Sequence, residues 1–157
     1  LDRFHSNDPR DYVAGFPDHP HRGFETVTVM LSGRVHHRDS RGNQGDIDGG
    51  GVQWMTAGRG IVHSEMPQRT DGWPSGLQLW INLPAREKMR APEYQDLPSR
   101  AIRRAPLSSG GGSAIIAGEI DGAKGPVAPR VTEPLLATLT LADRAMISEL
   151  DIRPTNP

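Results

Sequence analysis

Glycine and proline interrupt this chain so often that only short secondary-structure elements fit between them. Its 157 residues include 18 glycines and 14 prolines, which separate short apolar stretches at intervals of about 8–15 residues. The clearest stretches, residues 26–31 and 77–83, alternate between two side-chain types, and alternation is typical of a strand with one buried face. The spacing predicts an all-β sandwich or barrel. No stretch predicts a convincing helix.

Further strands are predicted on both sides of a glycine-rich, loop-like region at residues 97–112. They are shorter, and each is bounded by turn-forming residues: residues 34–38, 52–56, 61–66, 113–119, 135–141 and 146–152. The chain begins with Leu and ends just after a predicted strand. We therefore expect it to be a piece of a longer protein.

Composition excludes several classes of function. The chain has no cysteine, which excludes disulfides, thiolate ligands and a cysteine nucleophile. Its 18 basic and 19 acidic residues leave a net charge of -1, so we expect no direct binding to nucleic acid. No apolar run approaches the roughly 20 residues of a membrane span, and no signal peptide opens the sequence. We expect a cytoplasmic protein with no membrane partner.

Two pairs of potential metal ligands stand out, and each pair has its members two residues apart. They are His19 with His21, and His63 with Glu65. Side chains two apart in a strand point to the same face, and Pro20 holds its neighbours near extended geometry. Two such strands facing each other would bring three imidazoles and one carboxylate together. This set suits a divalent metal with open coordination positions.

Glu25, His36 and His37 are further polar residues close to these pairs in the sequence. Glu25 lies six residues after His19, and an even separation in a strand would place both side chains on the same face. Glu25 is therefore a candidate ligand, a partner of a ligand N–H, or a general base, and a simple partner of Arg22 is an equal alternative. His36 and His37 are adjacent and point to opposite faces, and we interpret both as ordinary strand residues. Without its partner pair, each pair would be interpreted as surface residues.

Three long blocks carry a resemblance to the pirin family. They are GFPDHPHRGFETVT at residues 15–28, VQWMTAGRGIVHSEMP at residues 52–67 and GLQLWINL at residues 76–83. The similarity is close over about residues 15–96 and thin beyond about residue 100. It implies the cupin fold, a jelly-roll β-barrel, in a family whose members have two barrels. Residues 1–112 are then expected to form the N-terminal metal-binding barrel, and residues 113–157 its closing strands and the beginning of a truncated second cupin.

The resemblance also implies a metal and an activity. The family's ligands fall on His19, His21, His63 and Glu65, and the implied metal is Fe(II), although Mn, Ni, Cu and Zn also fit such a set. The implied activity is that of a quercetin 2,3-dioxygenase, a ring-cleaving oxidoreductase acting on a flavonol-like substrate and O2. Here Glu65 is the anionic ligand, and Glu25 is a candidate acceptor of the substrate proton.

Two alternatives remain open at this point. One is a non-enzymatic, iron-dependent redox sensor that binds protein partners and regulates transcription or metabolism. The other is a closed structural zinc site, which the absence of cysteine and the presence of a carboxylate disfavour.

Overall fold

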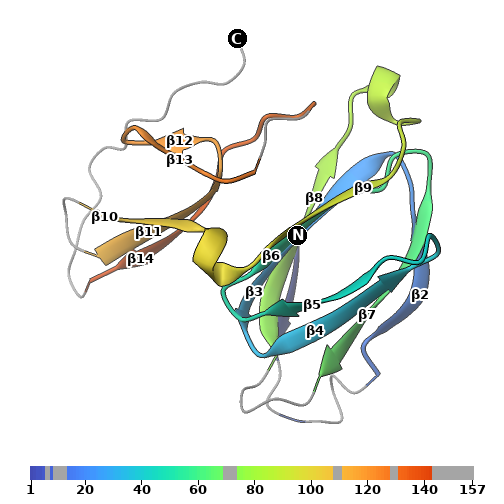
Figure 1. Cartoon of the computed structure of the whole chain (residues 1–157), viewed down its shortest axis with the longest axis horizontal. Coiled ribbons are helices and arrows are strands. Elements are labelled where there is room, and N and C mark those ends of the chain that lie inside the picture. The colour runs from blue at the N-terminus through green and yellow to red at the C-terminus, as the bar shows by residue number, and fades with distance from the viewer. Residues whose placement is uncertain (6–7, 9–13, 69–73, 108–110, 128–130, 143–157) are drawn as a thin grey trace. The chain divides into compact units, whose positions relative to one another are not determined.

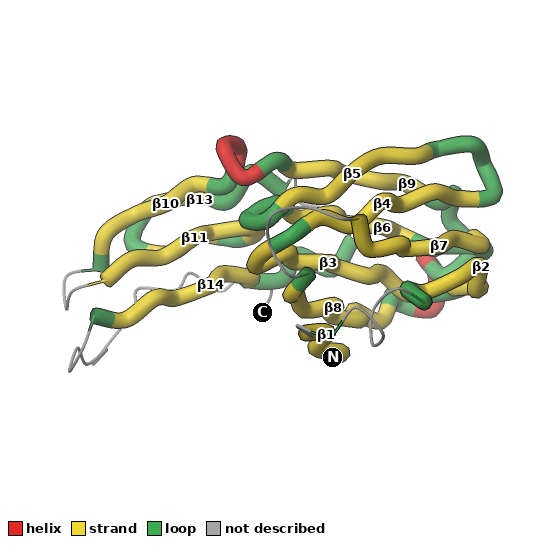
Figure 2. The backbone as a smooth tube through the Cα atoms, turned by 90° about the horizontal axis from the view of Figure 1, so that it is seen from below, coloured by secondary structure: helices red, strands yellow, loops and turns green. Residues whose placement is uncertain are grey.

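The chain folds into antiparallel sheets joined by short turns, as a computed structural model shows for residues 1–5, 8, 14–68, 74–107, 111–127 and 131–142. Figure 2 shows that strands dominate. Helical structure in these ranges is limited to two short 3-10 turns, η1 (Ala85–Glu87) and η2 (Ser99–Ala101). The predicted all-β class is therefore confirmed. None of the helices in the described segments is long and apolar enough to cross a membrane. The chain divides into two compact units, Leu1–Ser99 and Arg100–Pro157.

The first unit contains two antiparallel sheets (Figure 1). One has the order β1-β8-β3-β6-β9, with β1 at Asp2–His5, β8 at Ser75–Asn82, β3 at Phe24–Ser32, β6 at Val52–Thr56 and β9 at Glu93–Leu97. The other has the order β2-β7-β4-β5, with β2 at Phe16–His21, β7 at Ile61–Gln68, β4 at Arg34–Asp39 and β5 at Gln44–Asp48. Apart from β4 and β5, neighbouring strands in these two sheets are not consecutive in sequence, as in a jelly roll.

Buried apolar clusters identify the faces on which the two sheets meet. Met30 of β3 packs with Val35 and Ile47 of the other sheet, and Met55 of β6 packs with Ile61 of β7. Because side chains alternate along a strand, the even-numbered residues of β3 and the odd-numbered residues of β7 face the interior of the barrel. This assignment of inward-facing positions decides which polar side chains point into the barrel.

A tight connection leads from β6 into β7 and so sets the start of the strand that carries His63. Gly58 has φ +53°, and a Cβ at this position would collide with the backbone carbonyl of Arg90. Glycine alone adopts such a conformation without strain. The predicted strands at residues 52–56 and 61–66 on either side of this turn are confirmed.

The second unit contains a three-stranded sheet of β10 (Arg103–Pro106), β11 (Gly111–Ala117) and β14 (Leu136–Leu141), together with the short pair β12 (Glu119–Ile120) and β13 (Ala123–Lys124). The expectation of loop throughout residues 97–112 is wrong at β10, a short strand without alternation that forms by pairing with β11. β11 crosses the expected domain boundary at residue 112. The domain assignment itself stays a prediction, and the strand predicted at residues 146–152 lies outside the described residues.

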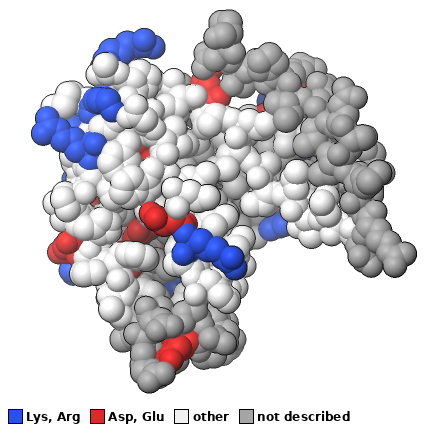
Figure 3. Space-filling model, turned by 180° about the vertical axis from the view of Figure 1, so that it is seen from behind, with Lys and Arg blue, Asp and Glu red and all other residues white. Residues whose placement is uncertain are grey.

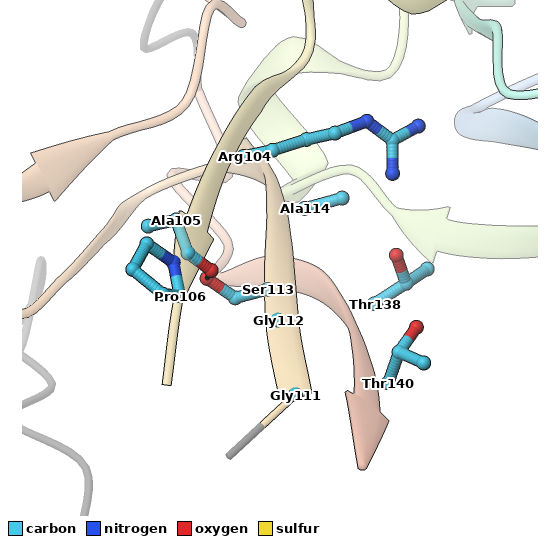
Figure 4. Close-up of a pocket in the computed structure, with 9 residues that line it drawn as sticks. All are labelled: Arg104, Ala105, Pro106, Gly111, Gly112, Ser113, Ala114, Thr138 and Thr140. Carbon is cyan, nitrogen blue, oxygen red and sulfur yellow. Dashed lines mark hydrogen bonds between the residues drawn. The ribbon is translucent and has the colours of Figure 1, made fainter. Parts of the chain in front are cut away.

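A groove of about 430 Å³ runs over this sheet. In Figure 4 the side chains of Arg104, Thr138 and Thr140 lie on one side of β11, whose Gly112 and Ala114 leave the surface low. None of the residues that line it is a histidine or a carboxylic acid. The groove therefore offers no ligand set for a metal.

Charges of both signs are interspersed on the surface. The face drawn in Figure 3 carries acidic as well as basic side chains. Among the described residues, several charged side chains form exposed or half-exposed pairs, such as Arg34 with Asp48 at 2.5 Å and Arg90 with Glu93 at 2.7 Å. Pairs of this kind contribute little to stability.

Candidate metal centre

The register between β2 and β7 brings three histidines together. His19 lies directly opposite His63, and His21 lies opposite Ile61. Because His19 and His21 are two residues apart on β2, their rings extend to the same face as His63. The ligand nitrogens of the three residues lie within 4.8 Å of one another, and their ring centroids are separated by 4.5 to 4.8 Å.

One hydrogen bond fixes the tautomer of His19. Its Nδ1 lies 2.8 Å from the carbonyl oxygen of Pro17, and a carbonyl can only accept. Nδ1 therefore carries the proton, and Nε2 presents a lone pair. That Nε2 lies within hydrogen-bond distance of Nε2 of His21, at 3.0 Å, so its lone pair is directed into the cluster. A backbone carbonyl on the far nitrogen is a common partner of a metal-ligating histidine.

His63 is enclosed without hydrogen-bond partners. Its side chain is 1% exposed, and neither ring nitrogen has a partner among the described residues. A buried polar group left unpaired costs about 1–3 kcal/mol. Such groups require an explanation in a folded protein, and an unseen ion is one of the usual ones.

The cluster favours neutral imidazoles. Burial, followed by the charge of His19, lowers the pKa of His21 to about 4. Burial, followed by the neighbouring histidines, lowers the pKa of His63 to about 3. Both rings are therefore neutral at physiological pH, which is the form that binds metal. The donor set, its convergence and its protonation state fit a divalent cation.

Glu65 lies on the same face of β7 as His63 but is held by other side chains. Its carboxylate is not part of the group whose ligand atoms lie within 4.8 Å of one another. It accepts hydrogen bonds from Thr28 Oγ1 at 3.0 Å and from Gln78 Nε2 at 2.7 Å. Burial raises the pKa of Glu65, and these two hydrogen bonds act in the opposite direction. Its assignment as a ligand stays a prediction.

Glu25 is not brought to the histidines. It accepts a hydrogen bond from Thr56 Oγ1 at 2.7 Å, and its odd position places it on the opposite face of β3 from Thr28, which contacts Glu65. The parity argument does not hold here because β2 ends at His21 and β3 begins in the other sheet after a turn. The catalytic role expected for Glu25 stays a prediction.

Sequence reasoning missed a fourth histidine inside the barrel. His36 lies at the surface beside Asp46, at 2.7 Å, as expected for an ordinary strand residue. His37 is 2% exposed, its ring centroid lies 5.3 Å from that of His63, and its Nε2 has no partner in the described part of the chain. His37 lies two residues from the apolar Val35 on β4, so both share one face, and this spacing could have predicted that His37 points inward.

Aromatic side chains border the cluster. Trp80 stacks on Phe24, with centroids 4.7 Å apart and planes 19° apart, and both rings meet His21 edge to face. Trp80 is nevertheless 53% exposed. The exposed ring of Trp80, backed by the half-buried Phe24, provides a flat apolar surface next to the candidate metal centre.

Fold and site together define a cupin-type β-barrel protein with a histidine cluster suited to a divalent metal. The sequence model of the Pirin family matches residues 1–81, just over half of the chain. The chain belongs to the pirin family, which confirms the resemblance described above.

Named relatives and solved structures agree with this assignment. A pirin-like protein of Caulobacter vibrioides is 46% identical over 150 residues, which cover 95% of this chain and 54% of that protein. The crystal structure of a quercetin 2,3-dioxygenase from Acinetobacter baumannii matches with a TM-score of 0.67 and 42% identity, over 73% of this chain and 42% of that one. The bacterial pirin YhhW from Escherichia coli, solved in complex with nickel(II), matches with a TM-score of 0.51 and 26% identity, over 68% and 52% of the two chains.

This chain spans about half the length, or less, of the proteins it resembles. The activity, substrate and partners of a whole protein are therefore matters for proposal.

Proposed function

We propose that His19, His21, His63 and Glu65 hold a divalent metal, Fe(II), and that the protein is a quercetin 2,3-dioxygenase-type oxidoreductase that cleaves a flavonol with O2. The observation that carries the proposal is the convergence of three imidazoles, two of them buried and kept neutral, with no other partner for the ring of His63 among the described residues. A solved relative that bears the name of this enzyme supports the choice of reaction.

The four side chains have distinct tasks in this proposal. The imidazoles supply three neutral nitrogen donors, and Glu65 supplies the single negative charge that matches a hard divalent cation. Thr28 and Gln78 both donate hydrogen bonds to the carboxylate, and these bonds favour its ionised form against the opposing effect of burial on the pKa of Glu65. When bound, the metal supplies Lewis acidity toward a substrate hydroxyl and redox capacity toward O2.

The border of the cluster supports an aromatic substrate. A flavonol is planar, and the exposed ring of Trp80, backed by Phe24, presents a flat face beside His21. Stacking there would orient the substrate and exclude water from one side of the cluster. Such positioning accounts for part of the rate advantage of an enclosed site.

The test joins metal content with turnover. Elemental analysis of the purified chain should find close to one equivalent of iron, and the His63→Ala variant should lose it. The His36→Ala variant is the matched control, since it removes a surface imidazole from the neighbouring strand and should keep the metal. Loss of metal from both variants alike would contradict the assigned ligand set.

Oxygen consumption with quercetin then tests the reaction. The iron-loaded chain should consume O2 and bleach the flavonol absorbance, and the His63→Ala variant should not. An iron-loaded chain that binds quercetin without consuming O2 would refute the dioxygenase assignment while leaving the metal site intact.

A further inference from the structure

An unbroken chain of hydrogen bonds leads from the exposed ring of Trp80 to the carboxylate of Glu65. Trp80 Nε1 donates to Gln78 Oε1 at 3.2 Å. Gln78 Nε2 donates to Glu65 Oε2 at 2.7 Å and to Thr28 Oγ1 at 3.1 Å. Thr28 Oγ1 in turn donates to Glu65 Oε1 at 3.0 Å. Both carboxylate oxygens are thus held by donors from the facing sheet.

The chemistry of these groups permits one orientation of the Gln78 amide. An indole N–H can only donate and a carboxylate can only accept, so the amide oxygen must face Trp80 and the amide nitrogen must face Glu65. The reversed amide would set a donor against a donor at one end and an acceptor against an acceptor at the other. Trp80 and Glu65 therefore favour the same orientation of the Gln78 amide, one from each end.

The residues joined by this series of hydrogen bonds differ sharply in exposure. Thr28, Gln78 and Glu65 are all buried, whereas Trp80 is 53% exposed at the border of the histidine cluster. No other donor among the described residues contacts the Gln78 amide oxygen, so the indole N–H is its hydrogen-bond partner. A change at the exposed ring thus reaches the buried carboxylate through a single amide.

We propose that Trp80 and Gln78 are positioning residues for Glu65, and that the Trp80 N–H tunes the metal affinity of the site through the Gln78 amide. The inference rests on the proposed role of Glu65 as a ligand. A carboxylate has enough lone pairs to bind a metal while it accepts these hydrogen bonds, and partners of this kind typically change metal affinity when they are removed.

The experiment measures Co²⁺ affinity and the visible Co²⁺ absorption bands of the whole chain, with no substrate present. Gln78→Met removes the amide and should weaken Co²⁺ binding about 10–100-fold. Trp80→Phe keeps an aromatic ring but removes the N–H, and should weaken binding about 3–10-fold and shift the absorption bands. Trp54→Phe is the matched control, because the Trp54 N–H has no hydrogen-bond partner among the described residues.

A double-mutant cycle separates this route from simple packing, since Trp80 also contacts His21. If Trp80 acts through Gln78, adding Trp80→Phe to Gln78→Met should weaken Co²⁺ binding no further. Additive losses would overturn the proposal and assign the effect to the ring contact. An unchanged affinity in Trp80→Phe or in Gln78→Met would also overturn it.

The Glu65→Ala variant distinguishes failure of the inference from failure of the proposed ligand set. If Glu65 is a ligand, this variant loses Co²⁺ affinity, and Trp80→Phe has no additional effect in its background. If Glu65→Ala binds Co²⁺ as the unaltered chain does, the ligand set is wrong, and the inference falls with it. If Glu65→Ala loses affinity but Trp80→Phe does not, only the inference fails.

Discussion

Replacing His63 with leucine should stabilise the metal-free protein and abolish metal binding. The side chain is almost completely buried, and both ring nitrogens lack partners among the described residues. Leucine has a similar volume and leaves no polar atom unpaired. An unpaired buried group costs about 1–3 kcal/mol, so we expect the free energy of unfolding to rise by about 1–3 kcal/mol in EDTA at pH 7.5.

The stability advantage of the His63→Leu variant over the unaltered protein should increase as the pH falls. The pKa of His63 is lowered to about 3 in the folded protein, against about 6.5 in an unfolded chain. Between these values the unfolded state binds a proton that the folded state does not, so the unaltered protein loses stability as the pH falls below about 6.5. From pH 7.5 to 5.5 this contribution is about 1.4 kcal/mol, and the leucine variant lacks it.

Urea unfolding followed by tryptophan fluorescence measures both effects. Trp54 and Trp80 lie on strands β6 and β8 of the first unit, so their fluorescence reports on the barrel that carries the site. Saturating Ni²⁺ should reverse the order of stability, because only the unaltered protein gains binding energy. The surface variant His36→Leu should show no comparable gain. A metal-free His63→Leu protein that is less stable than the unaltered protein, or whose advantage does not widen at pH 5.5, would refute this reasoning.

Three further outcomes follow from other contacts. His37→Phe should raise the stability of the metal-free protein by about 1 kcal/mol, measured by urea unfolding, since it removes an unpaired buried nitrogen; a loss of several kcal/mol would contradict this. Glu25→Gln should leave Ni²⁺ affinity within about twofold, by competition titration, because Glu25 bonds Thr56 on the other face of β3; a tenfold loss would place Glu25 in the metal site. Gly58→Ala should lower the free energy of unfolding by more than about 2 kcal/mol, because the new methyl group meets the Arg90 carbonyl; an unchanged melting temperature would show that the turn relaxes.

Strand periodicity alone could predict which of the candidate ligands share a face. Within one strand the two-residue repeat is enforced by backbone geometry, so the shared face of His19 and His21 could be read directly from sequence. The same rule gave the shared face of His63 and Glu65. That β2 and β7 are neighbours is not a local property, and the resemblance to a family supplied it before the register confirmed that His19 lies opposite His63.

The same rule failed where the chain turns. Gly23, with φ +79°, separates β2 from β3, and a turn does not preserve the phase of alternation. Glu25 therefore faces away from the cluster although its numbering matches that of His19. His37 was missed for a related reason, since the inward face of β4 depends on its pairing with β7. Side-chain chemistry within a strand is local, whereas its direction relative to the barrel is a tertiary property.

Buried polar side chains inside the barrel lower the stability of the metal-free protein where they lack hydrogen-bond partners. Thr28, Gln78 and Glu65 satisfy one another, so their burial costs little once all three are present. Among the described residues, six buried side-chain atoms lack partners, and three of them are imidazole nitrogens of His37 and His63. Local rules of burial are expected to fail at functional sites. The ring of His63 is one such place, because a cation at the three histidines would give it a partner, while the carboxylate two residues away is held by donors from Thr28 and Gln78. The barrel is therefore organised around the ligand it is proposed to bind, and the metal-free state carries the cost.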